Sequence, residues 1–309
     1  MSENIAFLFP GQGSQAVGMG RELARVYPAA QQTFDEADEA LGYKLSQVCW
    51  EGPEDKLRLT EITQPAILTV SVAACRVLQE KGLTPDIVAG HSLGEYSAHV
   101  AAGTLTFQDA VRTVRNRGRY MQEAVPVGEG AMAAVLGLSS LQVQQICEEA
   151  AQEEVCQPAN INSPDQTVIS GSKAAVERAA ELAKQRGAKR AVLLAVSAPF
   201  HCALMQPAQD RLAADLRALT FHAMRVPLVT NADAEAVCEP EQARDALIRQ
   251  VTGAVRWEQA MRVLMARGVE RFIEAGPGKV LCGLMRQIDR SKSCGNVENE
   301  ASLQKVVGR

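Results

Sequence analysis

Ser92 lies in the segment Gly-His-Ser-Leu-Gly at residues 90–94, which matches the G-x-S-x-G pattern of serine nucleophiles. The short apolar run 86–90 predicts a strand before it, and residues 93–103 predict a helix after it. A serine at such a sharp turn has an exposed hydroxyl, and the helix N-terminus offers unpaired N–H groups to a developing oxyanion. The pattern favours nucleophilic catalysis by Ser92, with the N–H of Leu93 as an oxyanion donor. A purely structural tight turn is the alternative.

A serine hydroxyl is a weak nucleophile and needs a base. The four histidines of the chain are the candidates: His91, His99, His201 and His222. His91 adjoins the serine on a strained turn, and His99 falls on the following helix. His201 lies in a connection between two predicted units, where rigid elements can hold a catalytic loop. We therefore predict that His201 is the base, with an incidental loop histidine as the alternative. The residues themselves indicate no acidic third member.

A glycine-rich loop at residues 10–15, Pro-Gly-Gln-Gly-Ser-Gln, follows the apolar run 5–9, which predicts a buried strand. Its spacing superficially matches a dinucleotide-binding fingerprint, but that fingerprint requires a second strand ending in an acid about 20 residues later. Residues 28–42 have a helical pattern instead. In hydrolase-like sites an early loop of this kind supplies the second oxyanion donor. We therefore expect this loop to face a substrate oxygen.

Arg117 has an unusual position on the predicted helix 107–123. Ala110, Val114 and Met121 form an apolar stripe at helical spacing, and Arg117 falls on that stripe. A buried guanidinium left without a partner costs roughly 3–5 kcal/mol. Arg117 is therefore expected either to bind a substrate carboxylate through two parallel hydrogen bonds or to form a structural ion pair. A side chain that extends to solvent is a further alternative.

Strands and helices alternate along most of the chain, which predicts a parallel sheet with helices on both faces. Between residues 127 and 197 the predicted order changes to β-α-β-β-α-β, the order of a ferredoxin-like unit. We predict an α/β fold in which a hydrolase-like large domain, residues 1–126 and 198–309, carries an inserted ferredoxin-like subdomain at 127–197. Residues 291–309 show no clear pattern and are expected to form a loose tail.

The composition excludes several other classes of protein. The chain has 309 residues, 47% of them hydrophobic, and a formal net charge of -4, so a globular protein is expected and a nucleic-acid binder is not. No apolar stretch approaches the roughly 20 residues of a membrane span, and the N-terminus does not have the pattern of a signal peptide. Eight cysteines without C-x-x-C spacing indicate reduced, cytoplasmic thiols and no zinc site.

Six motifs carry a resemblance to a known family. They are Phe-Pro-Gly-Gln-Gly-Ser-Gln at 9–15, Gly-His-Ser-Leu-Gly-Glu at 90–95, Arg-Gly at 117–118, Asn-Ile-Asn-Ser-Pro at 160–164, Ala-Pro-Phe-His at 198–201 and Glu-Ala-Gly-Pro-Gly at 274–278. Through them, residues 5 to about 288 resemble the malonyl-CoA:acyl-carrier-protein transacylases, which load extender units in fatty acid synthesis. The family has a hydrolase-like domain with a ferredoxin-like insertion, in agreement with the pattern above.

The resemblance implies a role for each matching residue of the catalytic centre. Ser92 is similar to the acyl-accepting nucleophile and His201 to its base. The backbone N–H groups of Gln12 and Leu93 are similar to the oxyanion donors. Arg117 corresponds to the residue that pairs with the malonyl carboxylate.

The resemblance also implies roles around this centre. The family orients its histidine by a backbone carbonyl, and Gln250 stands in the matching place. His91, Asn162 and Phe200 are implied to line the substrate pocket, and phenylalanine before the histidine is typical of malonyl-using relatives. Arg286 is expected to contact CoA phosphates or the acidic carrier protein.

The implied reaction is a ping-pong transfer of malonyl from malonyl-CoA to the phosphopantetheine thiol of an acyl carrier protein, without metal or cofactor, by a cytoplasmic monomer. A trans-acting polyketide acyltransferase is a close alternative, and a serine thioesterase or esterase could use the same turn. A carrier-protein docking module without catalysis is a third alternative, which the presence of both Ser92 and His201 disfavours.

Overall fold

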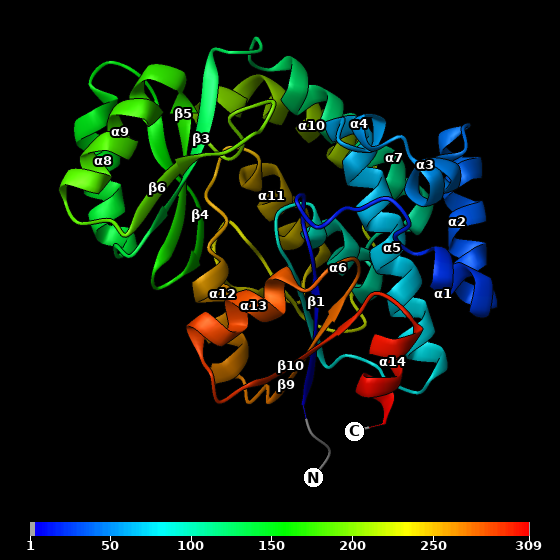
Figure 1. Cartoon of the computed structure of the whole chain (residues 1–309). Coiled ribbons are helices and arrows are strands. Elements are labelled where there is room, and N and C mark those ends of the chain that lie inside the picture. The colour runs from blue at the N-terminus through cyan, green and yellow to red at the C-terminus, as the bar shows by residue number, and fades with distance from the viewer. Residues whose placement is uncertain (1–3, 309) are drawn as a thin grey trace.

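The computed structural model describes residues 4–308 and contains two sheets with helices packed around them (Figure 1). Residues 1–3 and 309 lie outside the described residues, and with them the beginning of the N-terminal segment considered for a signal peptide. The larger sheet has the strand order β10-β9-β1-β2-β7-β8. Its strands are β1 (Ile5–Phe9), β2 (Ile87–Gly90), β7 (Leu228–Val229), β8 (Ala236–Val237), β9 (Arg271–Ala275) and β10 (Ser293–Val297).

The larger sheet is parallel except for β8, as the alternation of strands and helices predicted. Alternate residues of β1 face opposite sides, because the side-chain period of a strand is two. Phe7 and Phe9 join the core under α5 (Thr60–Glu80), whereas Ala6 and Leu8 join the core under α12 (Trp257–Ala266) and α13 (Val280–Ile288). Both faces of the sheet are therefore covered.

The remaining helices of the larger unit surround this sheet. They are α1 (Arg21–Val26), α2 (Pro28–Leu41), α3 (Leu45–Glu51), α4 (Glu54–Leu57), α6 (Gly94–Ala102), α7 (Phe107–Glu123), the 3₁₀ turn η1 (Ala203–Met205), α10 (Gln206–Ala218), α11 (Pro240–Gln250) and α14 (Glu300–Val307). The helices α1 to α5 and α7 gather on one side of the molecule, and α6 lies nearer its centre beside β1 (Figure 1).

The smaller sheet is antiparallel and has the strand order β4-β5-β3-β6. Its elements are β3 (Gly130–Leu136), α8 (Ser140–Ala151), β4 (Cys156–Ser163), β5 (Gln166–Ser172), α9 (Lys173–Gln185) and β6 (Arg190–Leu193). The two helices share a separate apolar core with the sheet. The β-α-β-β-α-β order predicted for a ferredoxin-like unit is confirmed, and all of its elements fall within 127–197. The boundaries at 126/127 and 197/198 stay predictions.

Helix α5 differs from the sequence expectation that no apolar stretch is long enough to cross a membrane. By length and composition this 21-residue helix passes that test, with a mean hydropathy of 1.2 over its most apolar window. Of that window, 89% is buried inside the described structure, which is the environment of a helix in a protein core.

The C-terminal segment also differs from expectation. Residues 291–308 do not form a loose tail, because β10 pairs in parallel with β9 and α14 buries Leu303 and Val306. The expectation of eight reduced thiols is wrong for two of them, since Cys282 and Cys294 form a disulfide with their Cα atoms 5.3 Å apart. The other cysteines of the described residues are free.

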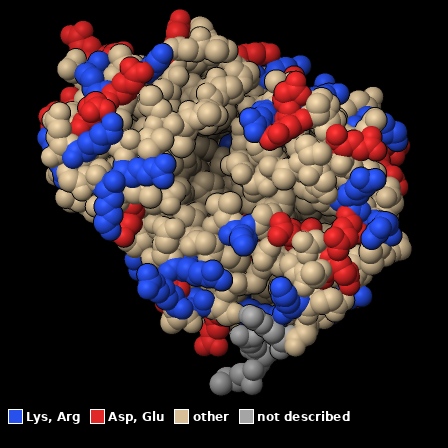
Figure 2. All heavy atoms as spheres, in the orientation of Figure 1, with Lys and Arg blue, Asp and Glu red and all other residues tan. Residues whose placement is uncertain are grey.

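The two units meet around a hollow in one face of the molecule. Figure 2 shows this hollow between the part built on the small sheet and the part built on the large one, with uncharged residues around its mouth. A pocket of about 360 Å³ lies there, lined by residues of both units.

Candidate active site

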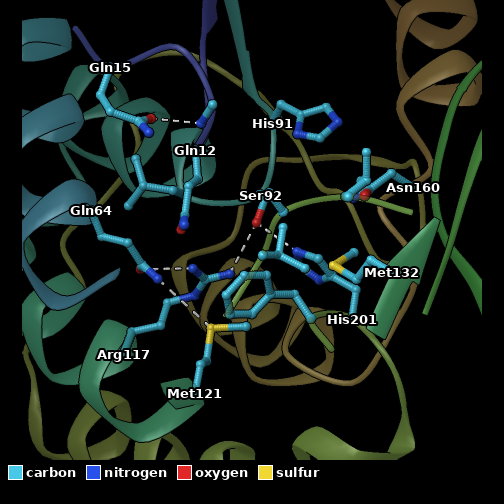
Figure 3. Close-up of a pocket in the computed structure, with 16 residues that line it drawn as sticks. Gln12, Gln15, Gln64, His91, Ser92, Arg117, Met121, Met132, Asn160 and His201 are labelled. Atoms are coloured by element: carbon cyan, nitrogen blue, oxygen red, sulfur yellow. Dashed lines mark hydrogen bonds between the residues drawn. The ribbon is translucent and has the colours of Figure 1, made fainter. Parts of the chain in front are cut away.

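Ser92 lies at the floor of the pocket, between β2 and α6. Its backbone φ of 51° is in the left-handed region, which few residues other than glycine adopt. The flanking glycines are required by close packing: a Cβ on Gly90 would lie 1.9 Å from Gly94 O, and one on Gly94 would lie 2.0 Å from Phe9 O. The strand-turn-helix predicted from the G-x-S-x-G pattern is therefore present, with the serine side chain turned into the pocket (Figure 3).

His201 and Ser92 are in contact, although 109 residues separate them. The Nδ1–H of His201 donates to the backbone carbonyl of Gln250 at 2.9 Å, which leaves Nε2 as an acceptor. Nε2 then accepts from Ser92 Oγ at 2.7 Å. The backbone carbonyl thus takes the orienting place that an acid has in other serine enzymes. His201 also has a left-handed backbone, with φ 59°.

The electrostatic environment keeps His201 neutral. The pKa of His201 is lowered from its ordinary 6.5 to about 3, mainly by burial and to a smaller extent by the nearby Arg117 cation. The hydrogen bond to the Gln250 carbonyl acts the opposite way but is the smaller effect. The imidazole is therefore free to accept a proton from Ser92 at neutral pH.

We expect the rate of Ser92 acylation to stay level as the pH falls from 8 to 5, because His201 remains unprotonated until about pH 3. Quenched-flow mass spectrometry of the acylated chain measures this rate. A fall with a midpoint near 6.5 would contradict it. The lowered pKa of His201 also makes the free energy of unfolding depend on pH. As the pH falls, the unfolded chain, in which His201 has its ordinary pKa of 6.5, binds the proton before the folded chain does. The free energy of unfolding therefore decreases as the pH falls from 6.5 toward 3.

Arg117 is 2% exposed and points at the nucleophile from α7. Its Nη1 donates to Gln64 Oε1 at 2.8 Å, and its Nη2 donates to Gln250 Oε1 at 2.9 Å and to Ser92 Oγ at 3.2 Å. Among residues 4–308 no carboxylate lies within 4.0 Å of the guanidinium. The alternative of a structural ion pair is therefore wrong for Arg117. Its side chain lines the pocket, where a ligand carboxylate could bind.

Helix packing explains how Arg117 reaches the pocket. A Cβ on Gly118 would lie 2.6 Å from Thr60 O, so glycine is what lets α7 approach the first turn of α5. That approach brings Arg117 beside Gln64, a residue that sequence reasoning missed. Figure 3 shows Arg117 and His201 reaching Ser92 from different sides.

The glycine-rich loop lies next to Ser92 because β1 and β2 are parallel neighbours, with Phe9 opposite Gly90. Parallel strands present their carboxyl ends at one edge of a sheet. Gln12 and Leu93 both line the pocket, and within the described part of the chain neither backbone N–H donates a hydrogen bond. Two N–H groups are thus available to an oxyanion. The N–H of Ser92 itself is already occupied by Asn231 Oδ1 at 2.7 Å.

The other expected pocket residues divide into two groups. His91 and Phe200 line the pocket. The expectation that Asn162 lines the pocket is wrong: it accepts from His91 Nε2 at 2.8 Å, while Asn160 of the same strand lines the pocket instead. Burial lowers the pKa of His91, so its ring is neutral.

Arg286 lies outside the pocket. It lies on α13 and borders a separate groove, together with Arg290 and Lys292. Lysine and arginine side chains gather below the hollow in Figure 2. The structure therefore places Arg286 where a group outside the reacting centre could be bound.

Sequence reasoning missed three further polar residues around the centre. Gln64 on α5 holds Arg117, and Glu95 and Asn231 form a buried hydrogen-bonded group behind Ser92. Glu95 is the last residue of the motif at 90–95, which was a signal. No pattern in the sequence marks Gln64 or Asn231. Among residues 4–308 no group of three or more metal-binding side chains occurs.

An α/β fold with a Ser–His pair at a strand-turn-helix is typical of enzymes that transfer or hydrolyse acyl groups. A family model described as "Acyl transferase domain" matches residues 6–309, and the chain belongs to the acyl transferase family. The chain is 52% identical over 285 residues to the malonyl CoA-acyl carrier protein transacylase of Escherichia coli K12, covering 92% of each chain. The predicted resemblance to the malonyl-CoA:acyl-carrier-protein transacylases is confirmed.

Solved structures agree with this assignment. The malonyl CoA-acyl carrier protein transacylase of Coxiella burnetii is similar with a TM-score of 0.98 and 45% identity, covering 100% of this chain and 98% of that one. A malonyl-transacylase in complex with the holo acyl-carrier protein of a type II polyketide synthase is similar with a TM-score of 0.97 and 47% identity, covering 99% of each chain.

Proposed function

We propose that this acyltransferase moves a malonyl group from malonyl-CoA to the phosphopantetheine thiol of an acyl carrier protein, through an ester on Ser92. The observation that carries the proposal is Arg117, a buried cation with no carboxylate partner among the described residues and with Nη2 3.2 Å from Ser92 Oγ. A buried charge requires a partner. In a malonyl group one methylene separates the carboxylate from the carbonyl that Ser92 attacks. The carboxylate therefore pairs with Arg117 while Ser92 attacks the carbonyl.

In the first half-reaction Ser92 Oγ attacks the thioester carbonyl carbon while its proton passes to Nε2 of His201. The carbonyl oxygen becomes an oxyanion, which the N–H groups of Gln12 and Leu93 stabilise. Loss of one such donor typically costs about 2.7–4 kcal/mol. The C–S bond then breaks, the CoA sulfur takes the proton from His201, and malonyl-Ser92 remains.

In the second half-reaction the carrier thiol gives its proton to His201 and attacks the ester carbonyl of malonyl-Ser92. The oxyanion forms in the same place. The C–O bond breaks, and Ser92 Oγ recovers its proton from His201. The same base and the same donors therefore serve both halves.

The basic groove that Arg286 borders, outside the pocket, indicates which partners could bind there. We propose that Arg286, with Arg290 and Lys292, contacts phosphates of CoA or acidic residues of the carrier protein. A solved relative in complex with its acyl-carrier protein supports a carrier partner. Fatty acid synthesis is the proposed pathway, and the polyketide alternative is tested by comparing the two kinds of carrier. A monomeric state, a cytoplasmic location and independence of cofactors and membranes stay predictions.

Intact mass spectrometry tests the proposed function. We expect the chain to gain one malonyl group on incubation with malonyl-CoA, and to lose it to holo acyl carrier protein faster than to water. Competition between malonyl-CoA and acetyl-CoA should give mainly the malonyl adduct. No adduct would contradict acyl transfer by this chain, and an adduct lost mainly to water would indicate a thioesterase.

A further inference from the structure

Asn231 lies two residues after the end of β7, the strand beside β2, and is fully buried behind the turn that carries Ser92. Its side chain bonds to both sides of that turn. Oδ1 accepts from the Ser92 N–H at 2.7 Å, and Nδ2 donates to Gly90 O at 2.7 Å. One amide therefore bridges the residue that ends the strand and the residue at the apex of the turn.

The backbone of Asn231 is also held by two hydrogen bonds. Its N–H donates to Glu95 Oε2 at 3.0 Å, and its carbonyl accepts from the Arg256 N–H at 3.1 Å. Glu95 is fully buried on α6, the helix that begins just after Ser92. The asparagine is thus fixed to the elements on both sides of the nucleophile and has little freedom to rotate.

Gln250 connects this group to the base. Its Nε2 donates to Glu95 Oε2 at 2.7 Å and to Ser92 O at 3.0 Å, while its own backbone carbonyl accepts from His201. The peptide N–H and the peptide carbonyl of Ser92 are therefore both bonded to this network, which also orients His201. A displacement of Ser92 relative to His201 would have to break these bonds.

The backbone of Ser92 requires such support, because a non-glycine residue at φ 51° is held there only by its surroundings. We propose that Asn231 is a positioning residue for the reaction: it keeps Ser92 in the left-handed turn with Oγ directed at Nε2 of His201. It touches neither substrate nor pocket, so it acts on the reaction step rather than on binding. This inference rests on the proposed acylation of Ser92.

The test is the malonylation of Asn231→Ala measured by quenched-flow mass spectrometry. We expect kcat for malonyl-enzyme formation to fall about 10²-fold, since small misplacements of reacting groups have effects of this size. The KM for malonyl-CoA should change less than about threefold. The rate of labelling by a fluorophosphonate, which reports the reactivity of Ser92 without a malonyl group, should fall in parallel.

Asn296→Ala is the matched control. Asn296 is also an asparagine near the carboxyl end of a parallel strand, and its Nδ2 donates to the carbonyl of Gly278 at 3.2 Å, but it lies away from Ser92. We expect wild-type acylation and labelling rates in this variant. An equal loss in both variants would overturn the inference, because it would reflect general destabilisation.

Asn231→Asp keeps the shape and the acceptor for the Ser92 N–H but removes the donor to Gly90 O. This variant tests the positioning role if Asn231→Ala does not fold. We expect a folded chain, checked by its melting temperature, whose kcat and labelling rate are reduced about tenfold. Wild-type rates in the folded variants would overturn the positioning role. Failure of the wild-type chain to form any adduct would instead contradict the proposed function.

Discussion

Replacing Ser92 with alanine is expected to abolish formation of the malonyl-enzyme and to lower transfer to the carrier protein by about 10⁴-fold or more. The nucleophilic oxygen is the one atom removed. Alanine keeps the backbone bonds of residue 92 to Asn231 and Gln250, so the turn should persist. The measurement is the intact mass of the chain after incubation with malonyl-CoA, with a thermal melt to show that the fold is retained.

Ser97→Ala is the control for this variant. Ser97 is buried on α6, the helix that follows Ser92, and its hydroxyl has no hydrogen-bond partner among residues 4–308. We expect normal malonylation of Ser97→Ala. A malonyl adduct on Ser92→Ala at the wild-type rate would place the nucleophile elsewhere, whereas a loss in both variants would point to damage to α6.

The turn around Ser92 could be predicted because its cause is local. Gly90 and Gly94 are required by contacts within a few residues and with the neighbouring strand, so they leave a short pattern in the sequence. The apolar run of β1 likewise records burial on both faces of a sheet. The ferredoxin-like order was predictable for the same reason, since each of its elements has its own periodicity.

The contacts that complete the centre could not be predicted from the residues alone. Asn231 lies in the turn after β7 and Gln64 lies on α5, and only the packing of whole elements brings them to Ser92 and Arg117. A single asparagine or glutamine leaves no periodic signal. The backbone carbonyl of Gln250 is even harder to predict from the residues, because every residue has a carbonyl. Only the family resemblance indicated this one.

The C-terminal segment shows another limit of sequence patterns. β10, Ser-Cys-Gly-Asn-Val, is an edge strand with one fully buried residue, Val297, so it has no alternation to detect. Its hydrogen-bonded pairing with β9 makes this segment a strand, although its own composition does not predict one. The same pairing places Cys294 beside Cys282 on α13, a proximity that a separation of 12 residues does not reveal.

Replacing Arg117 with alanine is expected to lower malonyl transfer about 10²–10³-fold and to narrow the preference for malonyl-CoA over acetyl-CoA by a similar factor. Loss of one partner of a buried charge pair costs about 2–5 kcal/mol. Malonyl-CoA loses the partner of its carboxylate in this variant, whereas acetyl-CoA has no carboxylate and is affected less. The measurement is the ratio of kcat/KM values for the two thioesters in the wild type and the variant.

Two further variants separate recognition of the carboxylate from support of the fold. Arg115→Ala removes an arginine from another face of α7, where it stacks 5.2 Å from the ring of Tyr43, and should leave selectivity unchanged. Arg117→Lys keeps the charge but cannot bond to Gln64, Gln250 and a carboxylate together, so its selectivity should fall between the wild type and alanine. Unchanged selectivity in Arg117→Ala would show that this cation supports the fold alone. The discrimination between substrates would then have to come from the walls of the pocket.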